Sequence, residues 1–170
     1  MNHFSAVVVG VAECKVSQDP GSSLVTYALG SCIALVLHDP EVRAAGLLHF
    51  MLPTSSLDAA KAKVNPAMYA DTGVAMLLQE MQQAGANIRR LVAHLAGGSQ
   101  ILDPQGFFAI GKRNHIAAKN LLWKAGILVK SESVGGSASR SFGVNVGTGQ
   151  IWLKHQEASS SVIQPAIETR

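Results

Sequence analysis

The strongest chemical candidate in this sequence is a cysteine at the point where a predicted turn becomes a predicted strand. Cys32 follows Gly30 and Ser31 in the stretch LGSCIALVLHD. A thiol reacts as its thiolate, so a reactive cysteine needs a neighbour that lowers its pKa or accepts its proton. A short flexible turn at Gly30 and Ser31 can present the thiol and aim backbone N–H groups at an oxyanion. Free cysteines are often simply buried, so these residues alone favour a core cysteine.

A histidine in an apolar strand is the candidate partner of this thiol. His49 lies in GLLHFMLP, where a titratable ring must be hydrogen-bonded or serve a purpose. If the strands of Cys32 and His49 pair as a hairpin around residues 39–44, the two side chains approach across the sheet. Thr26, on the strand that leads to Gly30, is placed to orient the imidazole. Taken singly, His49 is more typical of a hydrogen-bonded core histidine and Thr26 of an ordinary strand threonine.

Other kinds of site have weaker support in the sequence. The cysteines and histidines show no C-x-x-C or H-x-x-x-H spacing, and the glycine pairs lack a phosphate-loop or dinucleotide pattern. We therefore expect neither a metal nor a cofactor. The net charge is only +3 and the basic residues form short scattered pairs, so we also expect no nucleic-acid binding.

The composition is that of a globular α/β domain. The chain has 170 residues, of which 48% are hydrophobic and 15% charged, as in a single packed domain. No stretch approaches the ~18 apolar residues of a membrane-spanning helix, and the first residues do not form a secretory signal. Two cysteines make no disulfide framework. We expect a cytoplasmic protein without membrane insertion, in which a free thiol persists.

The order of the predicted elements indicates a mixed sheet covered by helices. An apolar stripe at residues 74, 77, 78 and 81 predicts a helix that ends at Gly85, and a second helix is predicted over residues 112–125. Short connections predict that the first four strands pair consecutively. We expect one domain over residues 1–155 and a flexible tail over 156–170. Strands are predicted over residues 7–16, 24–29, 32–38, 45–52, 91–95, 127–129, 141–146 and 150–155.

These candidate residues lie in motifs that resemble the CheD family of chemoreceptor glutamine deamidases. The resemblance runs over nearly the whole predicted domain, from about residue 7 to residue 154, and its two long motifs are the specific ones. They are TYALGSC at 26–32 and GLLHFMLP at 46–53, followed by YAD at 69–71, the glycine pair at 97–98, IGKRN at 110–114, and the glycine pair at 135–136 with Arg140.

The resemblance implies a Cys-His-Thr triad that needs no cofactor. By position, Cys32 is the nucleophile, His49 the general base and acid, and Thr26 the residue that orients His49, with backbone support from Gly30 and Ser31. The implied fold is a single-domain layered α/β sandwich with a mixed, largely antiparallel sheet, similar to bacterial toxin-type cysteine deamidase domains. The implied substrates are glutamines on the cytoplasmic helices of methyl-accepting chemotaxis receptors, and a CheC-type phosphatase is an implied partner.

Four positions depart from the family pattern. Ser133 and Ser139 replace an acidic residue and a glycine, and His94 and Ala96 replace a lysine and a phenylalanine. We expect these positions to shape the rim of the site or the partner surface. A non-catalytic adaptor that binds receptors or a CheC-type phosphatase is the alternative function. A cysteine protease is disfavoured because nothing in the sequence indicates an extended peptide cleft.

Overall fold

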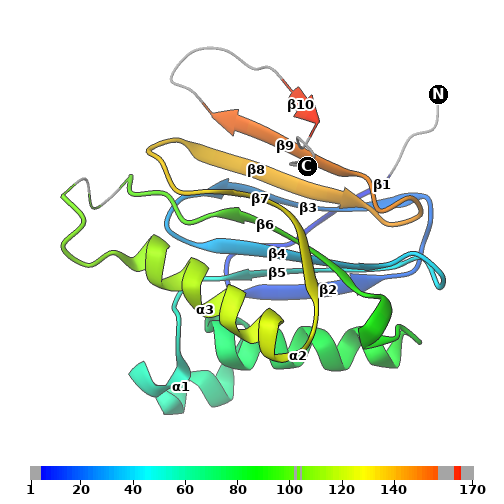
Figure 1. The fold of residues 1–170 in the computed structure, drawn as a ribbon, viewed down its shortest axis with the longest axis horizontal. Helices are drawn as coiled ribbons and strands as arrows, with labels where there is room; N and C mark the ends of the chain where they lie inside the picture. Colours follow the sequence, from blue (N-terminus) through cyan, green and yellow to red (C-terminus); the bar gives the residue numbers. More distant parts are fainter. Residues whose placement is uncertain (1–4, 102, 104, 157–162, 166–170) are drawn as a thin grey trace.

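Two five-stranded sheets pack face to face, and helices cover the free face of one of them (Figure 1). This computed structural model describes residues 5–101, 103, 105–156 and 163–165. The outer sheet has the strand order β1 (Ser5–Val8), β3 (Ser22–Leu29), β8 (Ser139–Asn145), β9 (Ile151–Gln156) and β10 (Ile163–Pro165). The central sheet has the order β2 (Glu13–Ser17), β5 (Ala44–Phe50), β4 (Ile33–Asp39), β6 (Val92–Gly97) and β7 (Leu128–Val134).

Both sheets are mixed and mostly antiparallel. The pairs β1–β3 and β6–β7 are parallel, whereas the other neighbours run antiparallel. The parallel pair β6–β7 is joined through a helix, as a parallel crossover requires. The predicted class, a layered α/β sandwich with mixed and largely antiparallel pairing, is confirmed; its likeness to toxin-type deamidase domains stays a prediction.

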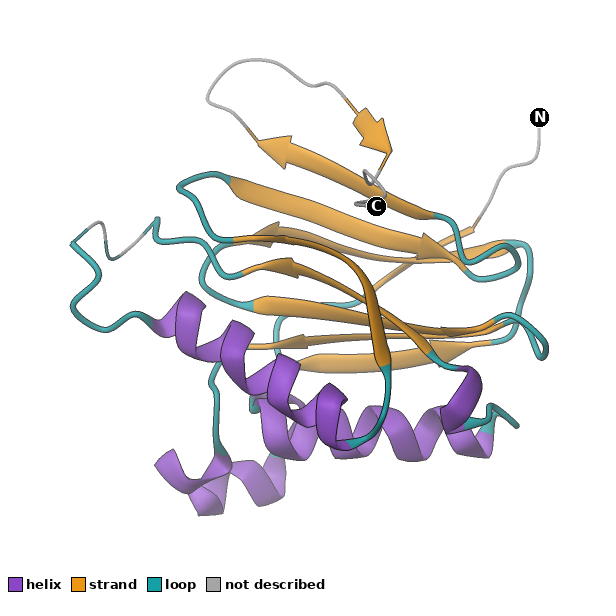
Figure 2. Cartoon of the chain, viewed as in Figure 1, coloured by secondary structure: helices purple, strands orange, loops and turns teal. Residues whose placement is uncertain are grey.

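The helical layer is formed mainly by α2 (Ala70–Gln83) and α3 (Ile110–Lys124), which lie against the central sheet (Figure 2). The stripe predicted for the first helix is buried at Val74, Leu77 and Met81, because these side chains recur on one face. Short turns of helix precede α2, in a stretch for which the sequence predicted neither a helix nor a strand. They are η1 (Ser55–Leu57), α1 (Ala59–Val64) and η2 (Pro66–Met68), and η3 (Ile88–Arg90) follows α2.

Strand β4 is buried along both of its faces, which explains the unbroken apolar run after Cys32. Because side chains alternate along a strand, Ile33 and Leu35 pack into the core under the helices. Ala34 and Val36 pack into a second core between the two sheets. The central sheet therefore carries one core on each face, and the second core is the layer in which the candidate site lies.

The predicted pairing of consecutive strands is correct for β4 with β5 and for β1 with β3, but it is wrong for β3 with β4. β3 belongs to the outer sheet and β4 to the central sheet, so the chain changes sheets at Gly30-Ser31-Cys32. The strand predicted over residues 7–16 is likewise divided into β1 and β2, which lie in different sheets. A turn at Val11 and Ala12 separates them, with Ala12 at a positive φ of 56°.

The predicted tail begins at the last residue of β9. Residues 163–165 pair antiparallel with β9, and residues 157–162 and 166–170 of that tail lie outside the described residues. The division into a domain over 1–155 and a tail over 156–170 therefore stays a prediction. Within the part of the chain that the structure describes, no helix is both long and apolar enough to span a membrane.

Candidate active site between the two sheets

Thr26 and His49 meet across the layer between the two sheets. Thr26 lies on β3 of the outer sheet and His49 on β5 of the central sheet, and both side chains are almost fully buried. The Thr26 hydroxyl lies 2.8 Å from Nδ1 of the His49 ring. Two of the three residues predicted for the triad are thus in direct contact although they come from different sheets.

A second hydrogen bond of Thr26 fixes the tautomer of His49. The Thr26 hydroxyl donates to the carbonyl oxygen of Val9 at 2.7 Å. A hydroxyl has one hydrogen to donate, so towards His49 it accepts, and the imidazole carries its proton on Nδ1. Nε2 is left as an unprotonated acceptor, and it has no hydrogen-bond partner among the described residues. His49 is therefore held as a neutral base with its free nitrogen inside the protein.

Cys32 lies one residue before β4, on the side of the central sheet that faces His49. The register pairs Ala34 with His49 and Ile33 with Phe50, which confirms the predicted hairpin of these two strands. Side-chain alternation then makes Cys32 and His49 diagonal neighbours on one face, roughly 7–8 Å apart between their backbones. Consistent with this, Cys32 is half-buried against the core between the sheets. No hydrogen bond joins His49 Nε2 to Cys32 among the described residues.

Burial favours a neutral thiol and a neutral imidazole in the resting site. It raises the pKa of Cys32, an effect that the Cys32 backbone N–H partly opposes. It also lowers the pKa of His49 to about 4. The other cysteine, Cys14, has its pKa raised to about 12 by burial and by the carboxylate of Glu80. The pKa shifts of Cys32 and His49 both disfavour a preformed thiolate–imidazolium pair at this site.

The backbone around Cys32 is held by the loop that follows β6. The carbonyl oxygen of Gly30 accepts from Ser99 N–H at 2.9 Å, and that of Cys32 accepts from Gly98 N–H at 2.8 Å. Gly97 has a φ of 111°, and a Cβ there would overlap the Cys32 carbonyl oxygen, so only glycine allows this close approach. The glycine pair at 97–98 is thus a support for the cysteine turn, a role that the sequence did not indicate.

The same turn leaves donors available where an oxyanion would form. Within the described residues, the N–H groups of Ser31 and Cys32 have no hydrogen-bond acceptor from another residue. The carbonyl oxygens of both residues are already occupied by donors. The turn therefore offers two free backbone donors next to the thiol, which is the arrangement that stabilises a tetrahedral oxyanion.

Arg140 also supports the loop that holds the cysteine turn. The sequence motif included this arginine, but no role was predicted for it. Its side chain is buried on β8 and donates to the carbonyl oxygen of Gly97 at 3.0 Å and to that of Gly135. The guanidinium therefore ties the outer sheet to the loop that holds Cys32. Its place in the motif was the only sign in the sequence that it matters. The fold shows that the two glycine pairs and this arginine lie together.

The departures at His94 and Ala96 do not lie at the rim, so that expectation is wrong for both. Ala96 is fully buried in the core between the sheets, and His94 is 7% exposed and bonded to the Ser131 hydroxyl at 2.6 Å. Both are on β6, whose side chains face one core or the other. Ser139 fits the expectation better, because its hydroxyl donates to Gln156 at the surface.

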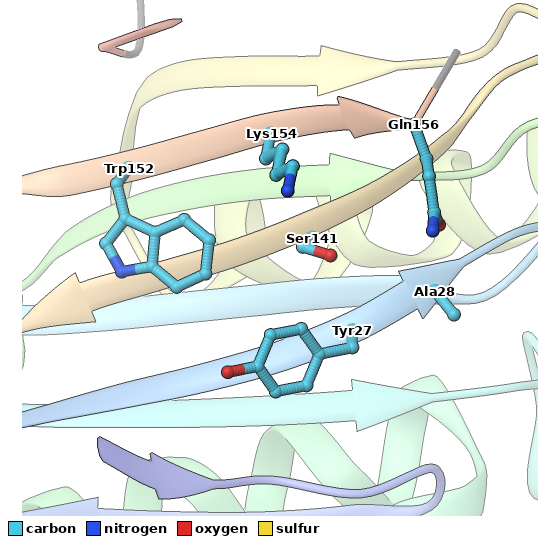
Figure 3. A pocket seen from close by; sticks show the side chains of 6 residues that line it. All are labelled: Tyr27, Ala28, Ser141, Trp152, Lys154 and Gln156. Atoms are coloured by element: carbon cyan, nitrogen blue, oxygen red, sulfur yellow. The ribbon is translucent and has the colours of Figure 1, made fainter. Parts of the chain in front are cut away.

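Of the cavities formed by the described residues, two bear on the candidate site. One of about 500 Å³ is on the outer face of the outer sheet, between Tyr27, Trp152 and Lys154 (Figure 3). Tyr27 follows Thr26 on β3 and therefore points to the opposite face of that sheet. The other cavity, of about 220 Å³, is lined by Ser31 and Ser99 and lies next to the cysteine turn. Among the described side chains, no three His, Cys, Asp or Glu gather as metal ligands.

These features define a mixed α/β protein with a candidate thiol site between its two sheets. Several known proteins are similar to it in sequence. A family model described as CheD chemotactic sensory transduction matches residues 51–155, a range that begins after the three candidate triad residues. A Solibacter usitatus protein named probable chemoreceptor glutamine deamidase CheD is 47% identical over 157 residues, 92% of this chain and 93% of its own. The chemoreceptor glutamine deamidase CheD of Thermotoga maritima is 37% identical over 147 residues, 86% of this chain and 90% of its own. The chain belongs to the CheD family.

Proposed function

We propose that this protein is a protein-glutamine deamidase that hydrolyses glutamine side chains of chemoreceptors to glutamate. The observation that carries the proposal is the Thr26–His49 hydrogen bond across the two sheets, which leaves His49 Nε2 unprotonated and without a partner among the described residues, on the sheet face that Cys32 shares. The names of the relatives supply the substrate, since both are called chemoreceptor glutamine deamidases.

The first half of the reaction forms a thioester. His49 Nε2 takes the proton of Cys32 as Sγ attacks Cδ of the glutamine, and the amide oxygen becomes an oxyanion held by the Ser31 and Cys32 N–H groups. The protonated His49 then gives its proton to the amide nitrogen. The C–N bond breaks, ammonia leaves, and the acyl group remains bonded to Sγ.

The second half regenerates the thiol. Water loses a proton to His49 Nε2 and attacks the thioester carbonyl, the same backbone donors hold the oxyanion, and the C–S bond breaks. His49 returns its proton to Sγ, and the product is glutamate. Thr26 accepts from Nδ1 throughout, so the ring keeps one orientation while Nε2 exchanges the proton.

The proposal includes the environment in which the enzyme works. Its substrates would be the cytoplasmic helices of methyl-accepting receptors, which places the enzyme in the cytoplasm. Each turnover adds a negative charge to the receptor, because a neutral amide becomes a carboxylate. No step needs a cofactor. Binding to a CheC-type phosphatase stays a prediction from the sequence resemblance.

The test is incubation of the full chain with a receptor cytoplasmic fragment, followed by peptide mass spectrometry. Wild type and Cys14→Ala should convert glutamines to glutamates, whereas Cys32→Ala should not. Equal inactivity of wild type and Cys32→Ala, with binding retained, would support the non-catalytic adaptor instead. Cleavage of the receptor backbone would indicate a protease.

A further inference from the structure

Asn114 is a fully buried polar residue that joins the two strands of the candidate site. It lies in α3, and its side-chain amide nitrogen donates to the carbonyl oxygen of Ser31 at 3.0 Å and to that of Met51 at 2.7 Å. Ser31 directly precedes Cys32, and Met51 follows the strand that carries His49. One amide group thus holds the backbone next to both reacting side chains.

We propose that Asn114 is a positioning residue that aims the Cys32 backbone N–H at the reacting oxygen. The inference rests on the proposed thiol chemistry for its consequence in catalysis, and on the hydrogen bonds of Asn114 for its geometry. Asn114 does not touch the substrate; it acts through the peptide bond between Ser31 and Cys32.

The planarity of the peptide bond transmits the effect. The Ser31 carbonyl and the Cys32 N–H belong to one peptide unit, in which the two groups of a trans bond point in opposite directions. When Asn114 binds the carbonyl oxygen on the side of α3, the N–H is turned away from α3. That N–H is the group that favours the Cys32 thiolate, and it has no acceptor from another described residue.

The bond to Met51 gives the same amide a second role. β4 and β5 are paired from Ile33–Phe50 to Asp39–Ala44, so Cys32 and Met51 lie just beyond the last pair. Other elements hold each segment separately, through the bonds from Gly98 N–H to the Cys32 carbonyl oxygen and from Met51 N–H to the Met68 carbonyl oxygen. Asn114 is bonded to both segments at once, and it thereby helps to set the distance between the Cys32 turn and the strand of His49.

The side-chain amide oxygen of Asn114 is left without a hydrogen bond to any described residue in this arrangement. Asn114 Oδ1 is buried and has no partner among the described residues. An unpaired buried acceptor is unfavourable, and such groups in native proteins call for an explanation. Neighbouring buried positions of α3, Ala118 and Leu122, are apolar. A donor at position 114 is therefore better explained by the two carbonyl groups that it holds than by packing of the helix.

The test compares Asn114→Ala with Asn120→Ala, which makes the same change at an exposed position of the same helix. The rate of Cys32 alkylation by iodoacetamide is measured against pH by peptide mass spectrometry, and kcat and KM are measured on a receptor fragment. We expect Asn114→Ala to shift the alkylation profile to higher pH and to lower kcat by roughly 100-fold with little change in KM, as for a misplaced reacting group. Asn120→Ala should match wild type in both measurements.

Circular dichroism at the assay temperature separates this loss from unfolding. If Asn114→Ala is unfolded, Asn114→Ser leaves a smaller cavity and is measured in the same way, with the same expected shift. A folded variant with the wild-type alkylation profile and kcat would overturn the proposal. If wild type converts no glutamine at all, the proposed function fails, whereas the alkylation profile still decides whether Asn114 controls the thiol.

Discussion

The residue that contacts the imidazole of His49 is a neutral threonine, which sets how the base must work. A carboxylate in that place would stabilise the imidazolium and raise the pKa of the ring. Thr26 can orient the ring but adds no charge, and burial holds the pKa of His49 at about 4. The ring is therefore neutral over the physiological range, so under the proposed mechanism its protonated form exists only beside the charge that develops on the reacting oxygen.

Replacing Thr26 by valine should separate orientation from packing. Valine has nearly the same shape, but it removes the acceptor for His49 Nδ1 and the donor to the Val9 carbonyl. We expect kcat for deamidation to fall roughly 10²- to 10⁴-fold, as when a triad loses its orienting residue. The unpaired buried groups should also lower the free energy of unfolding by about 1–3 kcal/mol.

Thr26→Ser is the matched control for this change. Serine restores the hydroxyl without the methyl group, so its kcat should lie within about tenfold of wild type, since the orienting hydrogen bond contributes more to the rate than the methyl group does. Steady-state kinetics on a receptor fragment and urea unfolding give the two quantities. If valine and serine reduce kcat equally, the hydroxyl does not orient His49.

Residue types and motifs assigned predicted roles to Cys32, His49 and Thr26, whereas Asn114 stood in the motif IGKRN at 110–114 without a role. Cysteine, histidine and threonine have side chains whose chemistry is evident from the residue type. The predicted hairpin also placed Cys32 near His49. Asn114 acts through carbonyl oxygens that lie 83 and 63 residues away in the chain. Every residue has a carbonyl group, so no pattern of side chains marks which ones an asparagine will bind.

At the level of secondary structure, the feature that matters most for the candidate site is the connection by which the chain passes from the outer sheet to the central sheet. The strands themselves were predictable from apolar runs and turn residues, and the run after Cys32 correctly indicated a buried strand. Their partners were not, because a three-residue connection fits a hairpin as well as a crossing between stacked sheets. Here it is a crossing, and it brings Thr26 to one side of the inter-sheet layer and Cys32 to the other.

The contact of α3 with the loop after β6 should be especially sensitive to an added methyl group. A Cβ at Gly111 would overlap the carbonyl oxygen of Gly98, and neither backbone can move without shifting the cysteine turn. Alanine would gain about 1 kcal/mol in helix propensity. We nevertheless expect Gly111→Ala to lower the free energy of unfolding by about 1–3 kcal/mol, the usual cost of overpacking, and to reduce kcat.

Gly73→Ala in α2 is the comparison, measured with Gly111→Ala by urea unfolding. A Cβ at Gly73 would meet the side-chain methyl groups of Leu48 at 3.1 Å, and those groups can shift. Its free energy of unfolding should stay within about 1 kcal/mol of wild type, because the gain in helix propensity offsets the contact. Equal losses in the two variants would show that the backbone contact of Gly111 has no special weight.

On the scale of the whole molecule, the layer between the sheets contains three buried histidines. His38 on β4, His49 on β5 and His94 on β6 are each at most 7% exposed. Burial lowers the pKa of all three, to about 4 for His49 and His94, and the positive charges of Lys130 and His38 add to the effect at His94. At His38, the Val146 carbonyl and Asp39 oppose it. Burial between the sheets thus favours the neutral form of all three rings in the folded protein.

This arrangement predicts a protein that loses stability in mild acid. A histidine has a pKa of about 6.5 in the unfolded chain, so between pH 6.5 and 4 the unfolded state binds more protons than the folded one. The free energy of unfolding should therefore be greatest above pH 6.5 and fall as the pH falls, by on the order of 3 kcal/mol each for His49 and His94 by pH 4. Urea unfolding at pH 7, 6 and 5 measures the slope, and His94→Gln, which cannot titrate, should make it shallower. A wild-type stability that is the same at pH 7 and pH 5, or a variant with an unchanged slope, would contradict the prediction, because the inter-sheet histidines would then accept protons without opening the fold.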